Sequence, residues 1–65
     1  MISDQEFATL IARTLGHGVR VVELADALSV SQPTIARWAL GVSAPYNGMR
    51  QIVADYIWKT YKVSA

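Results

Sequence analysis

Apolar residues recur at intervals of three and four along most of this chain, which is the spacing of one face of an α-helix. The first such stretch follows Ser3 and Glu6, a serine and a glutamate at the spacing of a capping box, which starts a helix. Gly16 closes the stretch, because glycine readily adopts the left-handed conformation at a helix end. We therefore predict a helix over residues 4–15, with an inward face of Phe7, Leu10, Ile11, Thr14 and Leu15.

Two shorter helices are predicted next, separated by residues 29–31. The first lies near residues 20–28, with apolar positions at Val21, Leu24, Ala25 and Leu28. The second spans residues 32–40 and is capped by Ser31. Pro33 suits its first turn, because proline lacks the N–H that would have no helical partner there. Gly41 ends it, and its inward residues are Ile35, Trp38 and Ala39.

A fourth helix is predicted over residues 47–61, after a loop at 42–47 that contains Pro45. Residues 56–63 are rich in aromatic and β-branched side chains, which suit a strand equally well. The helical period favours a helix, and a lone strand would have no partner. Its inward stripe is Met49, Ile52, Val53, Tyr56 and Ile57. The sequence thus predicts an all-α chain, one domain over residues 1–65, built as a compact bundle of four short helices.

Composition narrows the chemistry that the chain can perform. It has 65 residues, a net charge of +1, no cysteine and a single histidine, His17. Disulfides, thiolate metal sites and His-rich sites are excluded within one chain, so no metal, cofactor or small-molecule substrate is expected. A lone histidine and the lack of a glycine-rich phosphate loop argue against an enzyme. The sequence shows neither a signal peptide nor a membrane span, and we expect a cytoplasmic protein, located at the nucleoid when bound to DNA.

Residues 21–41 carry the most informative pattern. Two short helices joined by so few residues must cross at a steep angle, with a small residue where they approach and apolar residues in the wedge between them. In this register the segment resembles the helix-turn-helix of lambda-repressor/Cro-type DNA-binding domains. It departs from the family pattern at Ser29, where the turn usually has glycine, and at Val21, where a glutamine often contacts the DNA backbone. The positions that match are Ala25, Val30, Ile35 and Trp38.

The resemblance implies that helix 32–40 enters the major groove of a two-fold operator. It assigns base contacts to Gln32, which can pair with adenine through two hydrogen bonds, to Thr34, and to Arg37, one turn further along the same exposed face. The expected function is a small sequence-specific transcriptional regulator, of the repressor type that phages and mobile elements use. An ordinary solvated helix face is the alternative for these three residues. Expected phosphate contacts are Ser31, Arg20, Asn47 and Arg50.

A net charge of +1 is low for a protein that binds DNA, so this interpretation calls for a homodimer on double-stranded DNA. The last helix carries a second apolar stripe that could pair two copies, formed by Ala54, Trp58 and Tyr61. A partly buried core position is an equally weighted alternative for Trp58. The competing function is a protein-interaction module that binds through Trp58 and the surface of Val21 and Val22. An antitoxin-like regulator would combine both functions.

Overall fold

The computed structural model describes residues 2–65 and places four α-helices in this part of the chain. They are α1 (Asp4–Gly16), α2 (Val21–Leu28), α3 (Gln32–Leu40) and α4 (Asn47–Tyr61). No strand occurs within residues 2–65, and residues 56–61, for which a strand was the alternative, belong to α4. The all-helical prediction is confirmed, and each helix lies within one or two residues of its predicted bounds.

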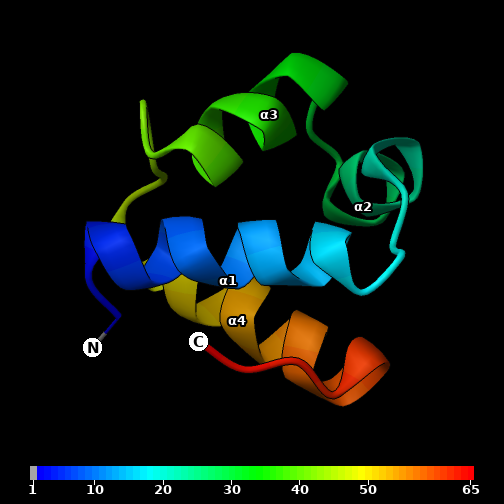
Figure 1. Ribbon diagram of the computed structural model, residues 1–65. Coiled ribbons are helices and arrows are strands. Elements are labelled where there is room, and N and C mark those ends of the chain that lie inside the picture. The colour runs from blue at the N-terminus through cyan, green and yellow to red at the C-terminus, as the bar shows by residue number, and fades with distance from the viewer. Residues whose placement is uncertain (1) are drawn as a thin grey trace.

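The first helix is the centre of the arrangement. It packs against α3 on one side and α4 on the other, and α2 packs against α3 (Figure 1). Figure 1 shows α2 almost end-on at the C-terminal end of α1, while α1 and α3 are seen from the side. The α2 helix therefore crosses both of them steeply. The four helices form a globule with principal extents of 25 × 23 × 19 Å.

The core forms where the inward faces of the helices meet. Phe7 of α1 packs edge-to-face on Trp38 of α3, with ring centroids 5.2 Å apart and an interplanar angle of 71°. Thr14 is also fully buried, and its hydroxyl donates a 2.8 Å hydrogen bond to the Leu10 carbonyl, so no polar group is left unsatisfied there. The buried apolar residues are Phe7, Leu10, Ile11, Leu24, Ala25, Ile35, Trp38, Val53, Ile57 and Val63.

Two residues near the C-terminus differ from the predicted core. Ile52, predicted to lie in the inward stripe, is 65% exposed. The face of α4 that contacts α1 is narrow and is centred on Val53 and Ile57, about 100° around the helix from Ile52. Val63 is buried although it follows the helix. Lys62 adopts a left-handed conformation (φ 60°), which turns the chain back and returns Val63 to the core.

The start of α1 agrees with the prediction and its end does not. The Ser3 hydroxyl accepts a hydrogen bond from the Glu6 amide, and the Ser3 amide donates to the Glu6 carboxylate, which confirms the capping box. The bond from the Ser3 amide lowers the pKa of Glu6 from its usual value. Gly16, however, remains helical, and the left-handed residue is Gly18 (φ 98°). The amides of residues 17 and 18 still bond to carbonyls of α1, so the chain reverses only after them.

The connection between α2 and α3 depends on an unusual backbone conformation at Ser29. This residue is left-handed (φ 58°, ψ 41°), as expected from its place in the turn. The Val30 amide donates to the Ala25 carbonyl at 3.0 Å and the Ser29 amide to the Asp26 carbonyl at 3.2 Å. These two bonds form the Schellman arrangement that ends helices, which a glycine usually completes. The chain can therefore turn at once into α3.

We predict that Ser29→Gly stabilises the protein. A left-handed conformation costs a residue with a Cβ about 1–2 kcal/mol, and the greater freedom of glycine in the unfolded chain offsets part of that cost. The free energy of unfolding should rise by roughly 0.5–1 kcal/mol, measured by denaturant titration. Ser43→Gly is the matched control, because residue 43 lies in a loop without a positive φ and should lose stability. Equal effects of the two changes would contradict this account.

Candidate nucleic-acid interface

One side of α3 presents a row of hydrogen-bonded polar side chains that runs from its N-cap to its last turn. The Ser31 hydroxyl caps the helix by accepting from the Thr34 amide at 3.2 Å, and the two hydroxyls lie 2.8 Å apart. Arg37 Nη2 then donates to the Thr34 hydroxyl at 3.3 Å. Residues three apart lie on the same side of a helix, so these contacts link Ser31, Thr34 and Arg37 along it. The guanidinium of Arg37 is thereby joined to this row by one hydrogen bond.

Gln32 belongs to the same surface but not to this row. It is the first residue of α3, it is exposed, and its side chain makes no hydrogen bond within residues 2–65. The sequence interpretation placed Arg37 on the same side as Gln32, and the structure corrects this. Five residues correspond to about 140° around a helix, so the two side chains lie at opposite edges of the exposed face. Pro33 and Ala36, both exposed, lie between them.

No acidic residue lies on α3, and α2 carries two, Glu23 and Asp26. The carboxylate of Glu23 accepts a 3.0 Å hydrogen bond from the Tyr61 hydroxyl, which directs it towards α4. Burial and this bond raise the pKa of Tyr61, so the tyrosine stays protonated as the donor. The polar end of α3 is therefore neither packed into the core nor hydrogen-bonded to a carboxylate within the described residues.

Of the predicted phosphate contacts outside α3, two are exposed at helix starts. Arg20 is the N-cap residue of α2, and its side chain makes no capping hydrogen bond. Asn47 is the first residue of α4 and is also exposed. Nothing within residues 2–65 engages either side chain in a hydrogen bond, and both can extend towards a ligand.

Arg50 does not behave as its sequence position suggested. Only 14% of its side chain is exposed, and it forms an ion pair with Asp4. Its Nε donates to the Pro45 carbonyl at 2.9 Å and its Nη1 to the Ile2 carbonyl at 3.2 Å. The guanidinium thus connects the start of α4 to the N-terminal segment. These internal contacts, rather than a phosphate contact, account for an arginine at position 50.

The predicted dimer face on α4 is divided by its internal contacts. Tyr61 is turned towards α2 by its bond to Glu23 and packs edge-to-face on Tyr56, with ring centroids 6.1 Å apart, so it does not extend the stripe. Ala54 is half-buried. Trp58 is 52% exposed, and the Lys62 ammonium lies 5.5 Å from its ring centroid.

The remaining chemistry of the described chain is sparse. His17 is exposed in the turn after α1. Among residues 2–65, no three metal-ligating side chains come together, and none of the four helices has the length and apolar character needed to cross a bilayer.

Comparisons with protein-family models, with curated proteins and with solved structures gave no match to this sequence.

We predict that Arg50→Met destabilises the protein. The substitution keeps much of the aliphatic stem but leaves two carbonyls and the Asp4 carboxylate without their donor. The free energy of unfolding should fall by roughly 1–2 kcal/mol in a denaturant titration. Arg20→Met is the matched control and should stay within about 0.5 kcal/mol of the parent, because that side chain is exposed and without a partner among the described residues. A reversed order of the two effects would show that the assignment is wrong.

Proposed function

We propose that this protein is a small sequence-specific DNA-binding regulator, with residues 21–41 acting as a helix-turn-helix and α3 entering the major groove. The observation that carries the proposal is the exposed polar face of α3, where Gln32 in the first turn and Arg37 in the last turn extend from a helix whose inner face is fixed in the core. The tight connection at Ser29 and the steep crossing of α2 and α3 support it, because a reading helix must protrude as a rigid unit.

In this proposal the two edges of the exposed face of α3 contact the bases. The Gln32 amide can donate to N7 and accept from the N6 amino group of adenine, and Arg37 can donate to O6 and N7 of guanine. Thr34 is only half exposed, and its hydroxyl bonds to Ser31 and Arg37. We therefore assign Thr34 the positioning of Arg37, with a base contact limited to its methyl group. Ala36 leaves room for a base pair between the two edges.

Backbone contacts set the register of the protein on the duplex. The Gln32 amide at the start of α3, next to Ser31, is a donor for a phosphate oxygen, whereas Pro33 has no N–H and the Thr34 amide already bonds to Ser31. Arg20 and Asn47, exposed at the starts of α2 and α4, are the other candidates. With so few cations the affinity of one copy is modest, and we expect two copies to bind a two-fold operator.

The test is selection of bound fragments from a random DNA pool, followed by sequencing. The proposal predicts enrichment of a short inverted repeat, and an affinity that falls steeply as the salt concentration rises. Gln32→Ala should weaken binding to that repeat about 5- to 150-fold and relax the preference at one base position, because a bidentate contact is worth about 1–3 kcal/mol.

Gln51→Ala is the matched control, since residue 51 is an exposed glutamine on α4. It should leave both the affinity and the preferred sequence unchanged. Retention without sequence preference, or an equal loss from the two glutamine changes, would overturn the proposal.

A second function is favoured by the apolar residues that α4 exposes. Ile52 is 65% and Trp58 52% exposed, as expected of a module that binds another protein, alone or in an antitoxin-like regulator. The same selection distinguishes the two functions, because an interaction module without DNA readout would enrich no sequence.

A further inference from the structure

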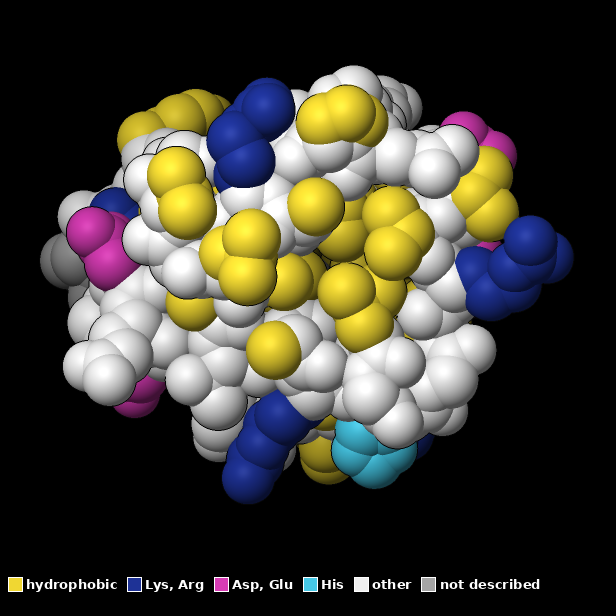
Figure 2. Space-filling view, turned by 45° about the horizontal axis from the view of Figure 1, so that its top comes forward, with side chains coloured by type: hydrophobic (Ala, Val, Ile, Leu, Met, Phe, Trp, Pro, Cys, Tyr) yellow, Lys and Arg dark blue, Asp and Glu magenta, His cyan; other side chains and the backbone are white. Residues whose placement is uncertain are grey.

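The exposed face of α3 is apolar between its two polar edges. Pro33 and Ala36 are three residues apart, so they lie next to each other on one side of the helix, and both are exposed. These two residues form an apolar strip, with Gln32 at one edge of it and Arg37 at the other. On the side of the molecule that carries α3, hydrophobic side chains gather in the middle and charged side chains lie mostly around them (Figure 2).

Neither side chain of the apolar strip can form a hydrogen bond. Ala36 offers a methyl group and Pro33 a hydrocarbon ring, and Pro33 also lacks a backbone N–H. A polar group pressed against these side chains loses its hydrating water and gains no partner, which costs free energy. The strip is therefore suited to contact with an apolar group.

The bases of DNA offer few groups of that kind. In the major groove, guanine presents two acceptors, adenine an acceptor and an amino donor, and cytosine an amino donor. Only thymine carries an alkyl group there, the methyl group on C5, and an alanine side chain is one of the groups that contact it. The chemistry of the strip therefore matches one base out of four.

The spacing of the two polar edges leaves one base pair opposite the strip. Residues 32 and 37 are five apart, which corresponds to about 7.5 Å along the helix axis. Base pairs follow one another at about 3.4 Å along the duplex, so this distance is close to two steps. The base pair between those contacted by Gln32 and Arg37 then faces Pro33 and Ala36.

We propose that the apolar strip selects thymine at this middle base pair, through contact with its C5 methyl group. The inference rests on the proposed function, because it requires α3 to lie in the major groove. It adds a third element of specificity, in which two apolar surfaces exclude water between the hydrogen-bonding contacts of Gln32 and Arg37. Such a contact needs no positive charge, which suits a chain with a net charge of +1.

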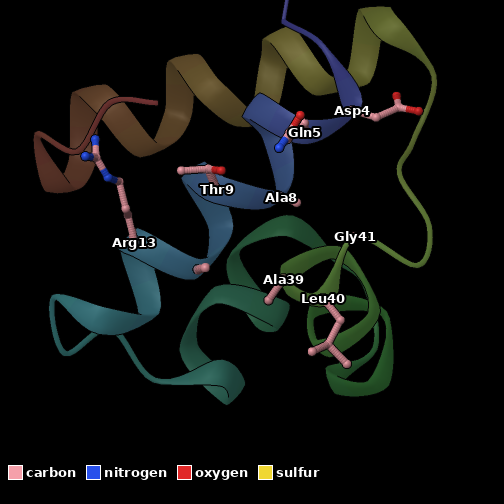
Figure 3. A pocket seen from close by; sticks show the side chains of 9 residues that line it. Asp4, Gln5, Ala8, Thr9, Arg13, Ala39, Leu40 and Gly41 are labelled. Atoms are coloured by element: carbon pink, nitrogen blue, oxygen red, sulfur yellow. The ribbon is translucent and has the colours of Figure 1, made fainter.

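A second apolar surface of the molecule is separate from the strip. It is a groove of about 640 Å³ between α1 and the C-terminal end of α3, and Ala8, Ala12 and Ala39 line it (Figure 3). Neither Pro33 nor Ala36 belongs to its lining. Ala12 is an exposed alanine within a helix, as Ala36 is, so it provides a matched position for a control.

The test uses the inverted repeat that the DNA selection enriches. Its middle position lies between the two positions at which Gln32→Ala and Arg37→Ala relax the base preference. Deoxyuridine in place of thymine there, in one half-site, removes only the methyl group and keeps the base pair. Binding should weaken about 3- to 5-fold, the effect expected of one buried methyl group. With cytosine at that position, methylation of its C5 should strengthen binding by a similar factor.

Ala36→Gly removes the methyl group that the protein contributes. It should lower the ratio of the affinities for the thymine and deoxyuridine sites to less than twofold. Because this ratio compares two DNAs with the same protein, the loss of stability that glycine causes within a helix does not affect it. Ala12→Gly is the matched control and should keep the ratio of the parent protein.

The outcomes separate this inference from the function on which it rests. A guanine–cytosine pair at the middle position, adjacent positions for Gln32 and Arg37, or a ratio near one for the parent would overturn the thymine contact and leave DNA binding in place. A ratio that Ala36→Gly leaves unchanged would do the same. Selection that enriches no sequence would overturn the proposed function and the thymine contact together.

Discussion

The contact between Phe7 and Trp38 determines what the rest of the molecule can present. The two rings are buried at a centroid distance of 5.2 Å, and they fix α3 against α1 in one rotational setting. Ile35, one turn before Trp38, is buried on the same side. Since residues about half a turn away must then face outwards, the packing of this aromatic pair decides that Ala36 and Arg37 are exposed.

A second constraint fixes where α3 begins. Ser29 ends α2 in a left-handed conformation, and Ser31 caps α3 two residues later. This connection is too short to adopt many conformations, so the first turn of α3 has a defined position relative to the core. The cap also does more than stabilise the helix, because its hydroxyl is the first member of the bonded row that ends at Arg37. The Ser31 hydroxyl therefore both caps α3 and begins the row of hydrogen bonds in the candidate site.

The sequence predicts the helices well because their signals are local. The capping box at Ser3, the Ser31 cap and the glycine at Gly41 act within a few residues of themselves, and all appear as expected. The roles of Arg50 and Tyr61 were not predictable in the same way. Their partners lie 48 and 38 residues away in the chain, and a helical period does not reveal which neighbour covers a given face. The exposure of Ile52 and the burial of Val63 have the same cause.

The low net charge is compatible with DNA binding if two copies share the contacts to the duplex. The candidate base contacts of one copy lie along a single short helix, from Gln32 in its first turn to Arg37 in its last. A single copy with one short reading surface gains few contacts, and each is worth only about 1–3 kcal/mol. When two copies bind adjacent half-sites, a weak contact between them raises the effective concentration of the second copy on the DNA. A weak contact between the two copies is then sufficient for both to bind, because the duplex already aligns them.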